Sequence, residues 1–377
     1  MTSRSKNIFD KAFDPTGSPD PALARVQRKL RAGGRFDAED GLACLETRDL
    51  IGLGRMAMDD RTARFGNQTF YVVNHHLNYT NICKNNCRFC AFHRAPGASG
   101  GYTLDPAEAA EKIAGSRMEG LREVHIVGGC NPALGLDYYL DLLRSLSRAR
   151  PGIRLKAFTA VEVDHIARTA GLSWRDTLIA LREAGLSAIP GGGAEVFSDR
   201  VRARLFPEKI DGRAWLAIHG EAHRLGVPTN ATLLFGHMET PEERIRHLLR
   251  LRAQQDETGG FQAFIPLPFL PANTGLHHLP GPTGVEILKT LAVSRLILDN
   301  IPHIKAYWVM LGIKLTQIAQ YFGADDLEGT VVQENIAHQA GAGTAQGLAQ
   351  SDLKAMIREA GFSPVERDTF HHRAAAS

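Results

Sequence analysis

The chain has 377 residues, of which 44% are hydrophobic and 23% charged, and its formal net charge is +3. This is an ordinary globular balance with enough apolar residues for a large core, and the mild charge, without a dense lysine and arginine block, argues against a nucleic-acid partner. No signal peptide and no apolar run of 18 residues is visible, and an odd count of 5 cysteines does not resemble a disulfide framework, so we expect a cytoplasmic protein that uses no membrane.

The first part of the chain predicts a loose arm followed by a few helices. Residues 1–20 are punctuated by Asp, Pro, Gly and Ser, which is typical of an irregular segment. From residue 21 to about residue 60, apolar residues recur at helical spacing and are interrupted by glycines. We expect residues 1–69 to form an N-terminal arm and helices that pack on the main domain.

The main domain shows short apolar runs that alternate with amphipathic segments of helical length. The predicted strands are 70–77, 123–127, 154–160, 186–189, 230–235 and 261–266, and the predicted helices between them are 106–119, 136–149, 174–183, 212–225 and 241–256. Such alternation predicts an α/β fold with a parallel sheet and right-handed crossovers. We expect a partial to full (β/α) barrel over residues 70–340, without deciding between six and eight strands.

The C-terminal part carries fewer signals. Residues 291–300 resemble a helix, and residues 323–335 have the turn and strand pattern of a seventh or eighth barrel element. Residues 341–377 are predicted to hold a Gly/Ala-rich loop, a last helix over 351–360 and a polar tail. We treat them as a C-terminal extension.

A cysteine triplet follows the first predicted strand, in the spacing C-x-x-x-C-x-x-C: Cys83, Cys87 and Cys90. Three thiols in one short loop indicate a metal or iron–sulfur site. A structural zinc site prefers four protein ligands, so it would need His75, His76 or His93 to complete it. The two other interpretations are ordinary buried thiols, and a four-iron cluster whose fourth iron is free to bind a small molecule.

Further candidate residues follow the other predicted strands, and ligands of parallel α/β folds collect at this edge. Gly128, Gly129, Cys130 and Asn131 follow the second strand. Glu162 follows the third, in an apolar run where an unpaired carboxylate would be costly, so it contacts either a ligand or a neighbour such as Lys156, His165 or Arg168.

The fourth and fifth strands also end in glycine-rich turns. Three glycines, residues 191–193, precede Glu195 and allow a ligand to approach the backbone closely. Gly236 follows the fifth strand, and Glu239 is either a ligand contact or a first-turn acid of the next helix. The sixth strand ends in an apolar run bounded by prolines, 264–269, that is suited to the wall of a flat ligand.

The cysteine spacing, with the aromatic Phe89 before the last cysteine, resembles the signature of the radical S-adenosylmethionine (SAM) enzymes. The resemblance implies a 4Fe-4S cluster on Cys83, Cys87 and Cys90, with SAM chelated by the open iron. It also implies SAM contacts from Gly128, Gly129 and Asn131, from Glu162 and Glu195, and from Gly236 beside the adenine. Cys130 stands where the superfamily usually has a Glu.

A wider resemblance covers residues 71–338 and points to the menaquinone (futalosine) branch of the superfamily, with the aminodeoxyfutalosine synthases favoured over the cyclases that act on dehypoxanthine futalosine. It is carried by HLNYTN (76–81), KAFTAVE (156–162), GGGAE (191–195), GHMET (236–240), DETGGF (256–261), DNIPHIKAYW (299–308) and FGADDLEGTV (322–331). Deazaflavin-forming enzymes resemble the chain next.

This resemblance implies that the 5′-deoxyadenosyl radical adds to 3-[(1-carboxyvinyl)oxy]benzoate, which gives 6-amino-6-deoxyfutalosine, methionine and bicarbonate. A small-molecule substrate with two carboxylates requires cations. The candidate substrate contacts are His76, Arg94, Lys305 and Tyr307, with Arg88, Lys314 and His338 as further cations. A flavodoxin or ferredoxin-type protein is the expected electron donor.

Two interpretations from other classes stay open. A zinc- or cluster-binding protein without catalysis would explain the cysteines alone. A SAM-dependent methyltransferase would leave the cysteine triplet unexplained.

Overall fold

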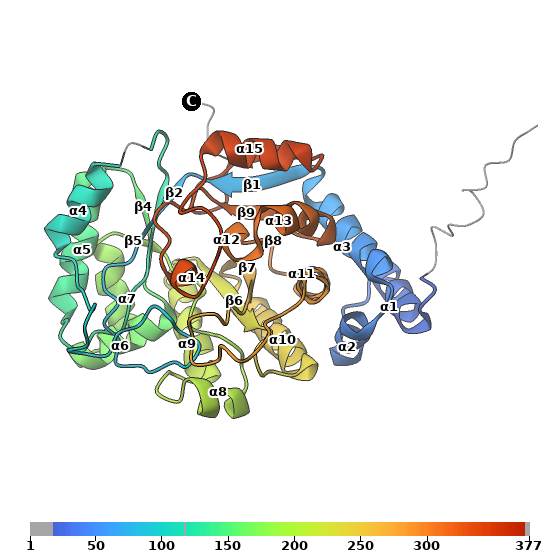
Figure 1. The fold of residues 1–377 in the computed structure, drawn as a ribbon, viewed down its shortest axis with the longest axis horizontal. Coiled ribbons are helices and arrows are strands. Elements are labelled where there is room, and N and C mark those ends of the chain that lie inside the picture. Colours follow the sequence, from blue (N-terminus) through green and yellow to red (C-terminus); the bar gives the residue numbers. More distant parts are fainter. Residues whose placement is uncertain (1–17, 117, 374–377) are drawn as a thin grey trace, which may run out of the picture.

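Parallel strands surrounded by helices form the centre of the structure (Figure 1). The computed structural model describes residues 18–116 and 118–373, so the loose arm predicted for residues 1–20 lies almost wholly outside the described residues. The strands are β1 Gln68–Val72, β2 Asn74–Leu77, β3 Glu123–Ile126, β4 Arg154–Ala157, β5 Leu186–Ala188, β6 Thr229–Phe235, β7 Phe261–Pro268, β8 His303–Ile304, β9 Asp326–Gly329 and β10 Ser363–Glu366.

The strands close into a ring. They form three sheets, β10-β1-β9, β2-β3-β4-β5 and β6-β7-β8, in which every neighbouring pair is parallel. Parallel bridges join the sheets at Ile189↔Thr229, Lys305↔Asp326 and His75↔Val332. Because only Val73 separates β1 from β2, they act as one strand, and the described chain has eight strand positions around the ring. The predicted α/β barrel is confirmed, in its full form.

Helices cover the outside of the barrel. They are α1 Pro21–Arg31, α2 Ala38–Glu46, α3 Leu50–Phe65, α4 Pro106–Ala114, α5 Leu136–Ala149, α6 Ala160–Ala170, α7 Trp174–Glu183, α8 Asp199–Leu205, α9 Gly212–Arg224, α10 Pro241–Thr258, α11 Gly284–Ile297, α12 Trp308–Leu311, α13 Ile313–Ala319, α14 Ile336–Gln339 and α15 Gln350–Glu359, with a 3₁₀ turn at Gln320–Phe322. Among the described residues, no helix is long and apolar enough to cross a membrane.

The third predicted strand, 154–160, is too long. The structure ends β4 at Ala157 and starts α6 at Ala160, because Thr159 and Glu162 form a capping box in which each side chain accepts the other's backbone N–H. The αL glycine Gly171 ends this helix. Glu162 therefore belongs to the first turn of a helix, directly behind the end of a barrel strand.

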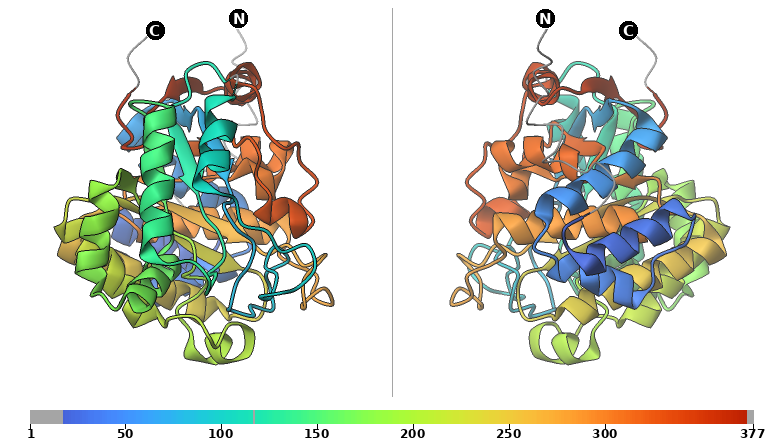
Figure 2. Two further views of the ribbon diagram at one scale, coloured as in Figure 1. Left: turned by 90° about the vertical axis from the view of Figure 1, so that its left-hand side faces the viewer. Right: turned by 90° about the vertical axis from the view of Figure 1, so that its right-hand side faces the viewer.

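The two ends of the barrel differ (Figure 2). Loops that follow the strands gather at one end, while α15 and β10 lie at the opposite end. The sequence predicted a polar tail after the last helix, but β10 pairs with β1 in parallel and the following Arg367 is completely buried. The helices of the first 69 residues pack beside α10 and α11 (Figure 1). The three-part division into 1–69, 70–340 and 341–377 stays a prediction.

Candidate functional site

The cysteine loop follows β2 at the loop end of the barrel. Cys83, Cys87 and Cys90 are all free thiols. The loop is held by its own backbone: the Cys83 N–H donates to the Arg94 carbonyl at 2.9 Å, and the Arg94 N–H donates to the Asn81 carbonyl at 2.8 Å. The Cys90 N–H donates to the Cys87 carbonyl at 3.0 Å. Three sulfur ligands are thus presented by one braced segment.

Arg94, a predicted substrate contact, lies within this loop. Its guanidinium donates to the carbonyls of Ala91 at 3.0 Å and His93 at 2.8 Å. His93 in turn lies beside Cys90, and a hydrogen bond with that thiol raises the pKa of His93 to about 9. The described contacts of Arg94 therefore serve the cysteine loop.

The thiols occupy unlike surroundings. Hydrogen bonding from Cys130 lowers the pKa of Cys83 to about 6, with the backbone N–H of Cys130 at 3.3 Å from the Cys83 sulfur. Burial raises the pKa of Cys87 to about 12. Thiolates are the form that binds iron, so a positive group near Cys87 would favour the ligand state.

Lys209 supplies that positive group, and sequence reasoning missed it. Burial alone would lower its pKa, but the Cys87 thiol and the Glu195 carboxylate outweigh burial and raise it well above the usual range. Its Nζ donates to Glu195 Oε1 at 2.6 Å and lies 5.1 Å from the centre of the Phe89 ring. The cofactor candidates Phe89 and Glu195 therefore meet through a lysine from the segment between α8 and α9.

The Gly128–Gly129 turn after β3 lies tightly against the cysteine loop. The Gly129 N–H donates to the Thr80 carbonyl at 3.0 Å, and a Cβ at Gly129 would lie 2.1 Å from the Ile82 carbonyl oxygen. A Cβ at Gly128 would lie 2.7 Å from the Tyr79 ring. Only glycine permits this approach, so the turn forms a fitted wall beside the three thiols.

The side chains of Glu162 and Asn131 are engaged by the protein. Glu162 Oε1 accepts from the Tyr79 hydroxyl at 2.8 Å and the Gly128 N–H at 3.0 Å, and Oε2 accepts from the backbone and side chain of Thr159 at 2.7 and 2.8 Å. A carboxylate has about four acceptor positions, so Glu162 is saturated and ties the glycine turn to α6. Asn131 donates to Thr103 Oγ1 at 3.0 Å.

Gly236 and Glu239 make local contacts. Gly236 adopts φ +87°, and a Cβ there would lie 2.5 Å from Pro282, so its space is filled by the chain. Glu239 accepts from the Gly236 N–H at 2.6 Å and from Arg244 Nε at 2.6 Å. Glu239 lies before Thr240, the N-cap of α10, so it is not a first-turn acid of that helix; its carboxylate instead ties the turn to Arg244.

The predicted substrate contacts are spread along the barrel. His76 lies in β2, and Tyr307 follows β8. Lys305 is completely buried and donates to Glu328 Oε2 at 2.6 Å. Among the further cations, Arg88 and Lys314 are exposed, whereas His338 lies 2.8 Å from Glu334 Oε2 and 3.0 Å from the Thr344 carbonyl oxygen.

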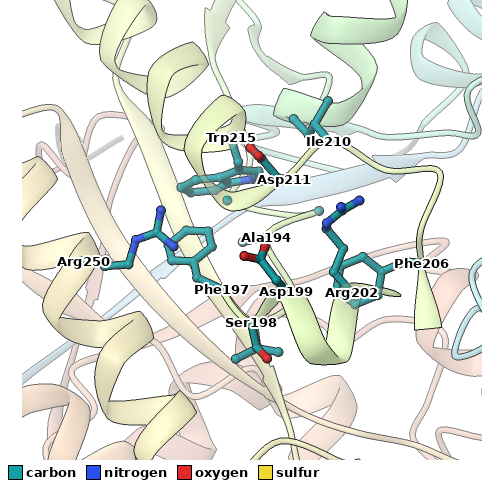
Figure 3. Close-up of a pocket in the computed structure, with 13 residues that line it drawn as sticks. Ala194, Phe197, Ser198, Asp199, Arg202, Phe206, Ile210, Asp211, Trp215 and Arg250 are labelled. Carbon is teal, nitrogen blue, oxygen red and sulfur yellow. The ribbon is translucent and has the colours of Figure 1, made fainter. Parts of the chain in front are cut away.

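Two cavities lie near the cysteine loop. The larger has about 260 Å³, and its walls include Lys84, Asn85, Cys130, Val161, His165 and Lys209. The smaller, between α8 and α9, has about 10 Å³, which is room for about one water. Figure 3 shows it, with Arg250 beside the Phe197 ring at 4.7 Å from the ring centre. Only the larger cavity has the size of a ligand site.

The donor set fits an anionic cluster with three protein ligands. Three thiols lie in one short loop, a lysine stands beside Cys87, and the glycine turn packs directly against this loop. A finger-type zinc site wants a fourth protein ligand. Of the histidines that could supply it, His75 and His76 lie in β2, and His93 lies beside Cys90.

Two protein-family models match the chain, and several known proteins are similar to it over most of its length. The model of the "Radical SAM superfamily" matches residues 77–251, and that of the "CofH/MqnC C-terminal region" matches residues 258–376. An aminodeoxyfutalosine synthase of Thermus thermophilus is 45% identical over 94% of this chain and 96% of its own length. Another, from Streptomyces coelicolor, is 43% identical over 93% and 94%.

More distant relatives share the same architecture. The 5-amino-6-(D-ribitylamino)uracil–L-tyrosine 4-hydroxyphenyl transferase of Methanopyrus kandleri is 38% identical over 94% of this chain and 98% of its own. The crystal structure of methylornithine synthase matches with a TM-score of 0.72 at 18% identity, over 90% of this chain and 97% of that one. The chain therefore belongs to the aminodeoxyfutalosine synthase family of the radical SAM superfamily, as an enzyme with a 4Fe-4S cluster and SAM as its cofactors.

Proposed function

We propose that this enzyme joins the 5′-deoxyadenosyl group of SAM to 3-[(1-carboxyvinyl)oxy]benzoate in menaquinone biosynthesis. The products are 6-amino-6-deoxyfutalosine, methionine and bicarbonate, so SAM is consumed as a building block. The observation that carries this proposal is the 45% identity over 94% of the chain to an aminodeoxyfutalosine synthase, together with a three-thiol loop at the mouth of a closed barrel.

Cys83, Cys87 and Cys90 would hold the cluster, which when bound and reduced cleaves SAM and supplies the 5′-deoxyadenosyl radical. Lys209 would balance the negative charge that the thiolates bring to the loop, because its ammonium lies near Cys87. Lys209 and Glu195 form an ion pair at 2.6 Å. If this pair opens, the Lys209 ammonium could bind the carboxylate of a ligand. Phe89 shields one side of this pair.

The backbone around the thiols would hold the remaining polar groups of SAM. The Gly129 carbonyl accepts the Asn131 N–H at 2.9 Å, so the Gly128 carbonyl would make the contact from this turn, and Glu162 fixes the turn by accepting the Gly128 N–H. Glu162 and Asn131 act in this view by positioning the turn. The closed ring of strands excludes water from the interior, as radical chemistry demands.

The donor of the electron and the cellular compartment belong to the same proposal. A flavodoxin or ferredoxin-type protein would supply the electron. The five cysteines are all free thiols, a state that the reducing cytoplasm maintains.

An anaerobic product assay tests the proposal. The reconstituted enzyme is reduced with dithionite in the presence of SAM and 3-[(1-carboxyvinyl)oxy]benzoate, and the products are separated by mass spectrometry. We expect a purine-bearing adduct and methionine in equal amounts. Cleavage of SAM to free 5′-deoxyadenosine, with the benzoate unchanged, would contradict the proposal.

A second function has specific support from the transferases at 38% identity. In the same assay, L-tyrosine and 5-amino-6-(D-ribitylamino)uracil replace the benzoate. A product that couples the two would assign the transferase reaction. Turnover of dehypoxanthine futalosine would instead assign the cyclase reaction, which the matched C-terminal region leaves as an alternative.

A further inference from the structure

Three nitrogen-bearing side chains lie side by side on the inner wall of the barrel. His76 on β2 is in register with His125 on β3, which is in register with Lys156 on β4. Val124 and Ile126, on either side of His125, are completely buried among the apolar core residues, so alternation turns His125 to the interior. The three residues form one level of the wall, which we call the His–His–Lys row.

The row carries nitrogen atoms without hydrogen-bond partners. His76 Nε2 and His125 Nδ1 are buried and have no hydrogen-bond partner among the described residues, and the buried Lys156 Nζ contacts Glu123 Oε2 at 2.7 Å. His76 is 7% exposed and Lys156 is 0% exposed. Buried polar atoms are nearly always satisfied in native proteins, so two unpartnered imidazole nitrogens beside an ammonium indicate that a polar ligand belongs there.

The imidazoles are arranged as neutral donors. Their rings stack at 4.5 Å between centroids with an interplanar angle of 8°. Burial lowers the pKa of His76 to about 3 and that of His125 to about 4. Each ring is therefore neutral at pH 7 and keeps one N–H to donate.

The charged side chains near the row determine whether its ligand is a cation or an anion. Glu123, His125 and Glu328 have ligand atoms within 4.8 Å of one another, a spacing that suits a metal ion. However, Lys156 Nζ lies 2.7 Å from Glu123 Oε2, and Lys305 Nζ lies 2.6 Å from Glu328 Oε2. Two ammonium groups already neutralise the carboxylates and would repel a cation. The ligand that suits the His–His–Lys row is therefore an anion that accepts hydrogen bonds.

We propose that His76, His125 and Lys156 form the subsite that receives the ring carboxylate of an aromatic acid substrate. This rests on the proposed function. His76 lies seven residues before Cys83, on the strand that leads into the cysteine loop, so the row lies below the mouth of the barrel. A substrate whose alkene reaches the adenosyl carbon at the mouth would extend its ring carboxylate inward to this level.

Lys305, the other interior lysine, is less suited to this task. Each lysine has one carboxylate partner at a similar distance, but Lys156 is in register with His125, whereas Lys305 is paired with Asp326 and stands outside the row. An ammonium has three donors, so Lys156 keeps donors for a carboxylate without losing its partner.

The experiment compares two substrates in three enzymes. 3-[(1-Carboxyvinyl)oxy]benzoate is tested against its analogue without the ring carboxylate, (1-carboxyvinyl)oxybenzene. We expect the wild type to prefer the benzoate by about 100-fold in kcat/KM, mostly through KM, because losing the carboxylate leaves buried donors unpaired. His125→Gln should reduce this preference to within about fivefold.

His75→Gln is the matched control for His125→Gln, because His75 is also a buried histidine and lies on the neighbouring strand β2, but points away from the interior, on the side of Lys112 in α4. It should keep the wild-type preference. Lys156→Met would leave Glu123 as an unpaired buried charge, so this lysine is tested in the double variant Lys156→Met/Glu123→Gln, whose folding is checked by circular dichroism. Retained preference in His125→Gln and in the double variant would overturn the proposal.

A binding measurement separates this subsite from the proposed function. Calorimetric titration of the cluster-loaded, unreduced enzyme uses 3-hydroxybenzoate and, as its neutral counterpart, phenol. We expect 3-hydroxybenzoate to bind at least about tenfold more tightly than phenol, and this difference to disappear in His125→Gln but not in His75→Gln.

Two results of that titration overturn the subsite. One is equal binding of the two probes by the wild type, and the other is stoichiometric Mn²⁺ binding that His125→Gln abolishes, which would make the row a cation site. An enzyme that binds 3-hydroxybenzoate as expected but forms no adduct refutes the proposed function and leaves the carboxylate subsite standing.

Discussion

The two ends of the barrel are stabilised in opposite ways. At the loop end, thiols and glycine turns converge, and the side chains there are held mainly by backbone groups: Arg94 serves three successive carbonyls, and Glu162 binds the Gly128 N–H. At the opposite end, fully buried ion pairs fill the interior: Lys305 with Glu328 and Arg367 with Asp326. The loop end is thus built to receive a ligand, and the other end to exclude one.

The difference has a physical reason. A buried ion pair is costly to desolvate and is kept only where its geometry is fixed, so the closed end is rigid and specified by the chain alone. Three adjacent thiols do not stabilise one another, and their usual partner is a metal or an iron–sulfur cluster. Substitutions at the two ends should therefore change different observables, activity at the loop end and stability at the closed end.

The largest effect is expected at the loop end, from Cys87→Ala. One of three cluster ligands is lost, so SAM cleavage should fall below detection while the circular dichroism spectrum of the barrel stays unchanged. Release of 5′-deoxyadenosine under dithionite is the measurement. Cys44→Ala, at a buried thiol in α2, is the control and should retain cleavage. Retained cleavage in Cys87→Ala would contradict the cluster assignment.

The closed end is tested by Arg367→Met. This change removes the arginine partner of the buried Asp326 carboxylate and leaves His371 Nε2 at 3.3 Å as its nearest remaining ion-pair contact, so the free energy of unfolding should fall by about 3–5 kcal/mol, as measured by urea denaturation. Arg373→Met, at an exposed arginine that donates to Gln68 Oε1, should change it by less than about 0.5 kcal/mol. A loss for Arg367→Met no larger than that of the control would refute the structural role of this ion pair.

Lys209→Met sharpens the comparison at the loop end. Removing the ammonium beside Cys87 and Glu195 should weaken SAM binding by about 10- to 100-fold, because one charged hydrogen bond is worth about 1.5–3 kcal/mol. Because Glu195 loses its ion-pair partner, folding is checked by circular dichroism. Equilibrium titration with SAM is the measurement. Lys112→Met, at an exposed lysine of the outer helix α4, is the control. Equal SAM affinity in both variants would remove Lys209 from the site.

The smallest expected effect concerns pH. Burial raises the pKa of Glu162 from its ordinary value of 4.5 to about 7. Between these values the folded state binds more protons than the unfolded state, so this carboxyl lowers stability as the pH rises from about 4.5 to 7. The loss amounts to at most about 3 kcal/mol. Urea denaturation at pH 5 and pH 7 should show a smaller loss over this range in Glu162→Gln than in the wild type; an equal loss would contradict the shift.

Much of the architecture could be predicted from the sequence because its signals are local. The short apolar runs and the helical segments between them predicted the α/β barrel, and four of the predicted helices match α5, α7, α9 and α10 within two residues, whereas α4 ends at Ala114, five residues before its predicted end. The cysteine spacing is also a local signal, and it predicted the position of the cluster-binding loop. The start of α6 was missed although its capping pair, Thr159 and Glu162, is visible in the sequence.

Other features depend on contacts between distant parts of the chain. Lys209 reaches the thiols only because α8 places its loop there, and Arg367 enters the interior only because β10 pairs with β1. The His–His–Lys row is created by register between three strands. The register between neighbouring strands cannot be derived from a single sequence. From the sequence alone, His125 and Lys156 are therefore indistinguishable from ordinary strand residues.

The most direct test of the account is the anaerobic reaction of reduced enzyme with SAM and 3-[(1-carboxyvinyl)oxy]benzoate, followed by mass spectrometry with isotopically labelled SAM. The account predicts that the labelled adenosyl group appears in 6-amino-6-deoxyfutalosine with one methionine released for each adduct. Label found only in free 5′-deoxyadenosine, or in no product, would contradict it.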